Sequence, residues 1–281
     1  MPTVSLSAGP IDYDDTGGDG PVLVLLHGVL MDASVWRPVV DRLARGHRCL
    51  TPTLPLGSHR HPMRPDADLS LPGLARLIGE FLDALDLHDV VLVGNDWGGA
   101  QLLTVHGDDS RVAALVLVAC EAFDNYPPGL PGRSLALAAR SRAGLWLGLR
   151  LLGTRLGRRM PGGWGWMSKR PVPDDVVDGW FAPATRDPAV RRDLRKYAAR
   201  SPDTATLLSW SARQAAFDRP VLVVWASEDK LMPRDHGRRL AHLYPAGRLV
   251  EIVDSYTLVP RDRPAALAAI VEDFVGTATR P

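Results

Sequence analysis

The stretch VVLVGNDWGGA, residues 90–100, joins a short apolar run to a glycine-rich turn and the start of a helical pattern. Because residues 90–94 are continuously apolar, we expect a strand buried on both faces, as in a parallel sheet covered by helices. The glycines indicate a strained turn and close packing of the next helix against the strand. Asp96 lies within that turn. An aspartate there is either a helix N-cap or a group that attacks carbon and forms an ester.

Similar apolar runs recur along the chain, with helical patterns between them. The other strand candidates are residues 22–26, 113–119, 221–226 and 248–253, and the helical patterns cover about 34–44, 72–86, 97–107, 234–243 and 264–275. This alternation predicts an α/β fold with a mostly parallel central sheet and helices on both faces. Residues 3–13 are expected to add an N-terminal hairpin.

The alternation stops between residues 122 and 212, which are rich in Trp, Gly and Pro and contain helical stretches without intervening strands. We expect this segment to be a helical cap over the carboxyl edge of the sheet. The predicted core is therefore residues 1–121 and 213–281.

Charge is unevenly distributed in the predicted cap. Residues 132–170 contain nine Lys or Arg and no Asp or Glu. An ordinary solvated face is one explanation. The alternatives are attraction of an anionic substrate, or weak contact with an anionic membrane surface through LWLGLRLLGTRLGRR, residues 145–159.

The bulk composition excludes several classes of protein. A net charge of +1 over 281 residues gives no indication of nucleic acid binding. Cys49 and Cys120 adjoin apolar runs and are expected to be buried thiols, since two cysteines make neither a disulfide framework nor a zinc pattern. Residues 1–20 lack the features of a signal peptide, and no apolar run approaches the roughly 20 residues of a membrane span. We expect a cytoplasmic protein that acts on a small molecule without a metal or an organic cofactor.

The motif GNDWGG, residues 94–99, is close to the G-H-D-W-G-G turn of epoxide hydrolases and haloalkane dehalogenases. The chain therefore resembles that branch of the α/β-hydrolase fold superfamily, in which the turn is called the nucleophile elbow. The order of the parts supports the resemblance over nearly the whole chain, because LLHGVL at 25–30 and WASEDKLMP at 225–233 flank the elbow and the cap as in that family. Two further stretches, residues 57–70 and 119–129, resemble uncharacterised actinobacterial α/β-hydrolases.

The resemblance implies roles for individual residues. Asp96 would attack an epoxide or a carbon–halogen bond, and Trp97 would help to hold a departing halide. The backbone N–H groups of Val29 and Trp97 would form the oxyanion site. Asp229 would be the acid of the catalytic triad, although an N-cap is its ordinary alternative. His27 is expected to be structural.

The resemblance fails in one place. The segment VDSYTLVPRDRP, residues 253–264, aligns with the family's terminal segment, but Tyr256 and Thr257 stand where the family has Gly-His. Threonine cannot act as a general base near pH 7, whereas histidine can, because its pKa of about 6.5 is close to the working pH. An ester on Asp96 would then form without being readily hydrolysed.

Three explanations for the missing histidine remain open. His59 or His61, on the loop after the second core strand, is one source of a base. Alternatively, Glu121 converges with Asp96 and Asp229, and like charges raise the pKa of one carboxyl group so that it serves as a base or proton shuttle. A strand-end residue that binds loop amides is the ordinary interpretation of Glu121.

In the third explanation the protein is not a hydrolase. Asp96 would act as an acid or base in an elimination, isomerisation or cyclisation, with Thr257 as a hydrogen-bond partner.

His106, His236 and His242 are expected to be structural or to face away. The leading hypothesis is hydrolysis of an apolar epoxide, halide or ester through Asp96, and the alternatives are such a non-hydrolytic enzyme or a ligand-binding protein that has lost catalysis.

Overall fold

The computed structural model describes residues 1–97, 99–160 and 164–278. Its centre is an eight-stranded sheet in the order β1-β2-β4-β3-β5-β6-β7-β8. The strands are β1 Thr3–Ser5, β2 Pro10–Asp15, β3 Val22–Leu26, β4 Arg48–Pro52, β5 Val90–Asp96, β6 Val112–Cys120, β7 Val221–Ala226 and β8 Gly247–Ile252. β1 and β2 pair antiparallel and the strands from β4 to β8 pair in parallel, which confirms the predicted α/β class.

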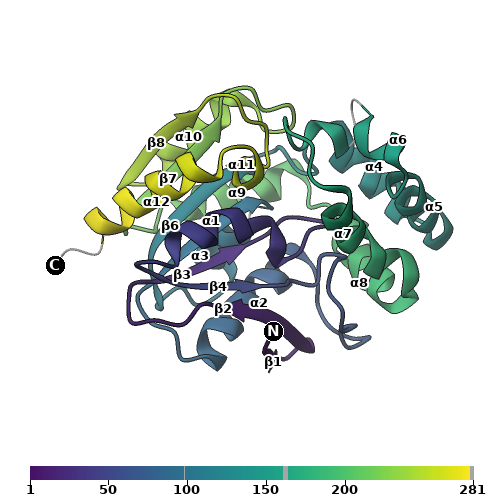
Figure 1. Ribbon diagram of the computed structural model, residues 1–281, viewed down its shortest axis with the longest axis horizontal. Helices are drawn as coiled ribbons and strands as arrows, with labels where there is room; N and C mark the ends of the chain where they lie inside the picture. Colours follow the sequence, from purple (N-terminus) through teal and green to yellow (C-terminus); the bar gives the residue numbers. More distant parts are fainter. Residues whose placement is uncertain (98, 161–163, 279–281) are drawn as a thin grey trace.

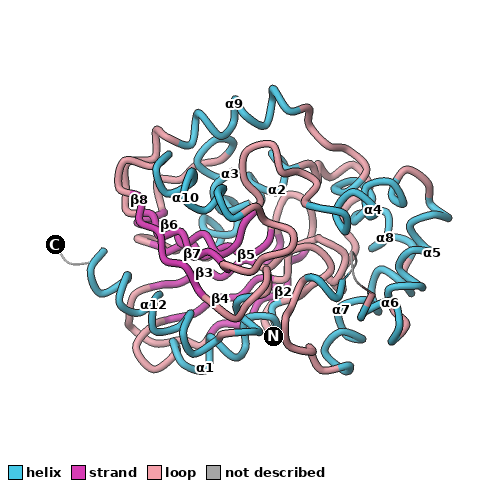
Figure 2. The backbone as a smooth tube through the Cα atoms, turned by 90° about the horizontal axis from the view of Figure 1, so that it is seen from above, coloured by secondary structure: helices cyan, strands magenta, loops and turns pink. Residues whose placement is uncertain are grey.

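Helices cover both faces of the sheet (Figure 1; Figure 2). Figure 2 shows α1, Arg37–Leu43, and α12, Pro264–Ala278, on one face. On the other face lie α2, Leu71–Ala84, α3, Gly99–His106, and α10, Arg234–Leu243. Strands β3, β5, β6 and β7 are buried almost throughout, because helices exclude water from both of their faces.

Between β6 and β7 the described chain is helical and contains no strand. We call residues 122–212 the helical insertion. Its elements are α4 Gly129–Ala139, α5 Arg142–Leu152, α6 Arg155–Arg159, the 3₁₀ turn Trp164–Trp166, α7 Asp174–Arg186, α8 Pro188–Ala198 and α9 Thr204–Gln214, the last of which extends two residues beyond the predicted boundary. The helices α4 to α8 form a group beside the sheet, whereas α9 packs against α3 (Figure 1). That the insertion forms a separate cap domain stays a prediction.

The structure confirms the prediction for the two cysteines and adds a strand, β4, that the predicted ranges lack. Cys49 and Cys120 are buried and unpaired, as expected. Strand β4 is the second core strand, but it matches none of the residue ranges predicted as strands, because its sequence RCLTP mixes polar and apolar residues. It is a strand because β3 pairs with it on one side and β2 on the other.

None of the described helices has the length and apolar character that crossing a membrane requires.

Candidate active site

Five residues singled out in the sequence follow five different strands at the same edge of the sheet. Val29 follows β3, Asp96 ends β5, Glu121 follows β6, Asp229 follows β7 and Thr257 follows β8. The carboxyl ends of parallel strands meet at one edge, which is where open α/β sheets bind ligands. The topology therefore brings these residues to the same end of the sheet although the chain separates them widely.

Asp96 has an unusual backbone conformation, and one backbone N–H group among the described residues donates to its side chain. Its φ of 65° lies in the left-handed region, which is uncommon for a residue other than glycine. The backbone N–H of Val29 donates to Asp96 Oδ2 over 3.2 Å. A Cβ atom on Gly28 would lie only 2.0 Å from the same Oδ2 atom, so a glycine is required beside the carboxylate. The turn thus projects a buried carboxylate toward the loop after β3.

The glycines around Asp96 serve close packing. A Cβ atom at Gly99 would lie 1.9 Å from the Trp97 ring, and one at Gly94 would lie 2.9 Å from the Cβ atom of Ala100. The first helical turn therefore packs directly on the indole and on the strand. Gly98, which is also part of the predicted elbow motif, lies outside the described residues.

Asp96 and Glu121 are neighbours at the carboxyl edge of the sheet. The register between β5 and β6 shifts at Asp96, which pairs with Cys120. The backbone N–H of Glu121 then donates to the Asp96 carbonyl over 2.9 Å. Both side chains are buried, at 4% and 6% exposure, and both line the same cavity.

Burial makes the carboxyl groups of this site weak acids. It raises the pKa of Asp96 to about 7, the Val29 N–H opposes this rise, and the charge of Asp229 adds to it. Burial and the charge of Asp96 hold the pKa of Glu121 well above its usual range. Burial also raises the pKa of Asp229 to about 6, against the N–H groups and the Thr257 hydroxyl that bind its carboxylate. Near neutral pH the site therefore holds both protonated and ionised carboxyl groups.

Thr257 is bonded to the predicted triad acid. Its hydroxyl donates to Asp229 Oδ1 over 2.8 Å, and this oxygen also accepts the backbone N–H groups of Leu231 and Met232 at 2.8 and 3.0 Å. The other oxygen, Asp229 Oδ2, is buried and has no hydrogen-bond partner among the described residues. The backbone of Thr257 is held by Asn95, whose side-chain Nδ2 donates to the Thr257 carbonyl over 2.8 Å.

The segment that carries Thr257 is fixed by a buried aspartate. The carboxylate of Asp262 accepts the backbone N–H of Tyr256 at 2.9 Å. It also accepts the hydroxyl of Ser168 at 2.7 Å and the N–H groups of Lys169 and Arg170, both at 2.8 Å, from the helical insertion. One carboxylate therefore connects the terminal segment to the insertion.

The two histidines considered as substitute bases have other partners. His59 Nε2 lies 3.3 Å from a carboxylate oxygen of Asp193, and His61 Nε2 lies 3.2 Å from one of Asp12. Neither histidine lines the cavity. Both ring nitrogens of His27 are bonded to backbone groups, and burial lowers its pKa to about 4, which keeps the ring neutral.

The remaining candidate histidines lie apart from the cavity. His106 packs against Trp210, the ring of His236 packs against Phe123, and the exposed His242 binds a backbone carbonyl of its own helix. None of the three lines the cavity. Within the part of the chain that the structure describes, no group of three or more His, Cys, Asp or Glu side chains is arranged to hold a metal ion.

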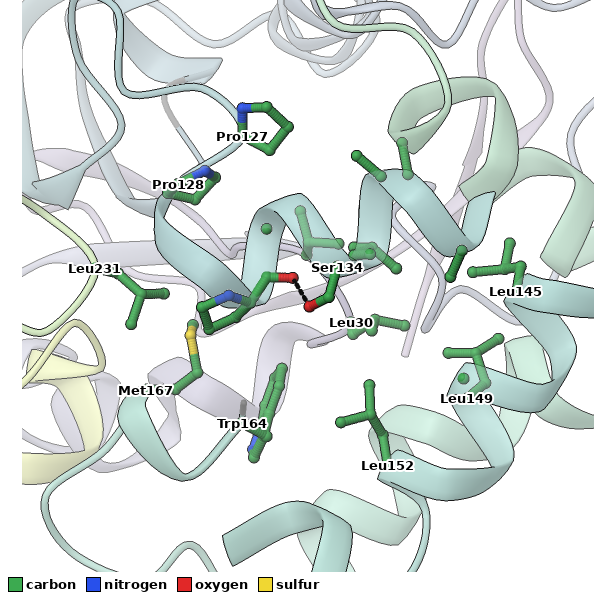
Figure 3. A pocket seen from close by; sticks show the side chains of 18 of the residues that line it. Leu30, Pro127, Pro128, Ser134, Leu145, Leu149, Leu152, Trp164, Met167 and Leu231 are labelled. Atoms are coloured by element: carbon green, nitrogen blue, oxygen red, sulfur yellow. Dashed lines mark hydrogen bonds between the residues drawn. The ribbon is translucent and has the colours of Figure 1, made fainter. Parts of the chain in front are cut away.

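Asp96 and Glu121 line a cavity of about 350 Å³ between the sheet edge and the helical insertion (Figure 3). Its walls are mainly apolar and come from the insertion, and Figure 3 shows side chains from several of its elements around the same space. The labelled wall residues are Leu30, Pro127, Pro128, Ser134, Leu145, Leu149, Leu152, Trp164, Met167 and Leu231. The cavity suits a small or medium-sized apolar molecule.

Two tyrosines also line the cavity, and the sequence had not singled them out. The ring of Tyr197 on α8 packs edge-on against Tyr126 at 6.2 Å and against Trp97 at 6.4 Å. Burial holds the pKa of both tyrosines above the usual range, so both hydroxyls stay protonated. Their position could not be derived from local sequence, because Tyr197 reaches the cavity only through the packing of α8.

The comparisons with known proteins extend along most of the chain. A family model described as alpha/beta hydrolase fold matches residues 21–260. Haloalkane dehalogenase 2 of Mycobacterium tuberculosis is 27% identical over 279 residues, which cover 95% of this chain and 92% of that protein. A haloalkane dehalogenase of Mesorhizobium japonicum is 37% identical over 90 residues, which cover 32% of this chain and only 28% of that protein. The crystal structure of an alpha/beta hydrolase fold protein from Burkholderia ambifaria has a TM-score of 0.76 at 27% identity and covers 97% of both chains.

Proposed function

The chain belongs to the α/β-hydrolase fold family, and on this premise we propose that it is a hydrolase in which Asp96 attacks an electrophilic carbon of a small apolar molecule, an epoxide or an alkyl halide. One observation carries the proposal. Asp96 stands in a left-handed turn at the edge of an apolar cavity, with one oxygen held by the Val29 N–H. The relatives that bear the name haloalkane dehalogenase support the same class of substrate.

In the first step an oxygen of ionised Asp96 forms a bond to the substrate carbon. The carbon–oxygen bond of the epoxide, or the carbon–halogen bond, breaks, and its electron pair leaves with the oxygen or the halide. The Val29 N–H stays on the oxygen that becomes the ester carbonyl, in the manner of an oxyanion site. An epoxide also needs a proton on its departing oxygen. Glu121, whose raised pKa keeps it protonated, lines the same cavity and supplies that proton.

In the second step water adds to the ester carbonyl carbon of Asp96 and gives one proton to a base, and the family's histidine is absent. The bond between that carbon and the oxygen that carries the substrate then breaks, and the alcohol leaves with the proton held by the base. The second proton of the water stays on Asp96, from which it returns to Glu121 after an epoxide or is released to solvent after a halide. Asp229 takes the role of base in our proposal. It does not itself line the cavity, but it lies near enough to Asp96 for its charge to raise the pKa of that carboxyl group. Its Oδ1 is held by Thr257 and two backbone N–H groups, whereas its buried Oδ2 accepts no hydrogen bond from the part of the chain that the structure describes. A carboxylate with a pKa of about 6 is ionised at neutral pH and is basic enough to accept a proton from water.

Thr257 favours a second candidate function. Without an imidazole at residue 257, the first step can proceed while the ester persists, which would make the protein a single-turnover or ligand-binding homologue. Alternatively, ionised Asp96 and protonated Glu121 form a base and acid pair for a non-hydrolytic reaction such as an isomerisation. Both alternatives use the same cavity.

Intact-protein mass spectrometry with product analysis separates these functions. The protein is incubated with 1,2-epoxyhexane or 1-bromohexane in ¹⁸O-labelled water. Hydrolysis through an ester leaves ¹⁸O in the carboxylate of Asp96, because water attacks the carbonyl carbon. Asp96→Asn should show neither adduct nor product. Asp19→Asn, an exposed aspartate remote from the site in sequence, is the matched control and should behave like the wild type.

Each result has a distinct meaning. Diol or alcohol with ¹⁸O in Asp96 supports the hydrolase. A lasting adduct on Asp96 without product supports the single-turnover alternative. Product that forms while Asp96 stays unlabelled, or turnover retained in Asp96→Asn, contradicts the role of Asp96 as the nucleophile.

A further inference from the structure

The outer face of helices α4, α5 and α6 is unusually apolar. Ten large apolar side chains are exposed among the described residues, and seven of them belong to these helices or to the residue that follows them. Their exposed fractions range from 41% to 77%. They are Leu130, Leu137, Trp146, Leu147, Leu151, Leu156 and Met160. Scattered exposed apolar residues are normal, but a concentration on one face marks an interaction surface.

Arginines alternate with these apolar side chains. Arg155 and Arg158 pair with aspartates of α7. The other arginines of the face make no ion pair with any residue that the structure describes, and they are Arg133, Arg140, Arg142, Arg150 and Arg159. No Asp or Glu occurs between residues 132 and 170. We call this surface the arginine–leucine face.

We propose that the arginine–leucine face docks on an anionic lipid surface. A helix that lies in the membrane interface has Trp and Leu on the side that enters the acyl region and Arg beside the phosphates. α5 has this arrangement, because its exposed side contains Trp146, Leu147 and Leu151 together with Arg150, whose guanidinium lies 5.2 Å from the centroid of the Trp146 ring. A second copy of the chain fits less well, since its own arginines would be brought against these. A free anionic molecule would leave the apolar side chains exposed.

The arginine–leucine face lies at the outer end of the cavity, so docking would bring the cavity to the lipid surface. Ser134, Leu151 and Met160 line the cavity and are also exposed, so the outer end of the cavity reaches the surface at this face. Figure 1 places α4, α5 and α6 at the margin of the molecule opposite α12. A docked protein would therefore take an apolar molecule from the lipid directly into the cavity. This delivery rests on the proposed function, whereas the docking itself does not.

Vesicle co-sedimentation of the full chain tests the docking without any substrate. We expect binding to phosphatidylcholine vesicles that contain phosphatidylserine, with weaker binding at high salt, and little binding to phosphatidylcholine alone. Each arginine near the surface contributes about a five-fold gain in affinity, so Arg142→Gln with Arg150→Gln should weaken binding about 25-fold. The matched control is Arg45→Gln with Arg238→Gln, two exposed arginines elsewhere, which changes the net charge equally.

The apolar contribution has its own pair of variants. Trp146→Ser with Leu147→Ser should also weaken sedimentation with anionic vesicles, while Leu208→Ser, at an exposed leucine of α9, should leave it unchanged. Thermal unfolding establishes that each variant is folded. Absence of binding to anionic vesicles at low salt, or an equal loss in the control pair, would overturn the proposal. So would a dimer in light scattering that Trp146→Ser with Leu147→Ser dissociates, because the face would then belong to a second copy. Inactivity toward epoxides and halides leaves the binding result unaffected and bears only on the proposed function.

Discussion

Thr257 and Asp229 are joined by a hydrogen bond of 2.8 Å from the threonine hydroxyl to Asp229 Oδ1. Thr257, which the sequence resemblance aligns with the family's histidine, thus binds the predicted triad acid. On that alignment threonine supplies no group that can accept a proton near neutral pH, while the terminal segment is still connected to Asp229.

Restoring the imidazole should shorten the lifetime of the ester on Asp96. In Thr257→His the ring would bind Asp229 and accept a proton from water, and general base catalysis contributes about 10²- to 10⁴-fold in rate. The lifetime of the adduct, followed by intact mass after the free epoxide is removed, measures this effect. An adduct that persists equally long in a folded Thr257→His protein would contradict the assignment of residue 257 as the position of the missing general base.

Thr257→Val is the matched control for that substitution. It keeps the branched shape and removes the hydroxyl, so the adduct should live no shorter than in the wild type. Because the Thr257 hydrogen bond lowers the pKa of Asp229, its removal should raise that pKa. The change is measurable as an upward shift in the pH at which product release begins.

Glu121→Gln should distinguish an oxygen leaving group from a halide. A departing alkoxide needs a proton and a departing halide does not, so the substitution should slow epoxide opening by about 10²-fold and leave bromide displacement within a few-fold. Adduct formation on the two substrates, compared in one preparation, gives the ratio. Equal losses on both would indicate that Glu121 has a structural role.

Adduct formation should depend on pH through Asp96. Only the ionised carboxylate attacks, and burial raises the pKa of Asp96 to about 7. The rate should therefore rise about ten-fold per pH unit below pH 7 and level off above it. A rate that is flat between pH 5 and pH 8 would mean that Asp96 is ionised throughout and that the site is more polar than its geometry implies.

The same carboxyl group should lower the stability of the fold as the pH rises. Because the pKa of Asp96 is higher in the folded chain than the usual 3.8 of an unfolded one, its contribution to stability is present below pH 3.8 and is lost as the pH rises to about 7. Asp96→Asn removes this dependence. Relative to the wild type, its free energy of unfolding should increase by about 2 to 3 kcal/mol between pH 5 and pH 8. Urea unfolding at the two pH values measures the difference, and parallel pH profiles would refute it.

Gly28→Ala should disable the site while the fold is kept. The added Cβ atom would lie 2.0 Å from Asp96 Oδ2 and would displace the carboxylate from the Val29 N–H. We expect no detectable adduct and a loss of stability of about 1 to 3 kcal/mol from overpacking. Gly179→Ala, at an exposed helical glycine with open space around its Cβ position, should leave adduct formation unchanged and stabilise α7 by about 0.5 to 1 kcal/mol. Normal adduct formation by Gly28→Ala would refute the requirement for glycine.

The sheet could be predicted because its central strands are continuous apolar runs, a local signal that burial on both faces imposes. The edge position of Asp96, Glu121, Asp229 and Thr257 followed from the same signal, since the carboxyl ends of parallel strands meet. Strand β4 could not be found in this way, because Arg48 and the threonine of RCLTP interrupt the pattern.

Contacts between segments that are distant in the sequence could not be predicted from local sequence patterns. His59 pairs with Asp193, which lies 134 residues further along the chain, and no motif connects the two. Tyr197 reaches the cavity from α8 only because the insertion folds over the sheet edge. The carboxyl pKa values likewise depend on burial that the whole fold creates.

Asn95 holds the backbone at residue 257 without contributing to the contacts of its side chain. Its side-chain amide binds the backbone carbonyls of both Val118 and Thr257 at 2.8 Å, so the main chain there is held from the strand side whatever side chain it carries. The hydrogen bond from Asn95 holds the backbone of residue 257 and does not involve its side chain. A substitution at residue 257 therefore changes the group that faces Asp229 while the hydrogen bonds that hold the main chain are kept.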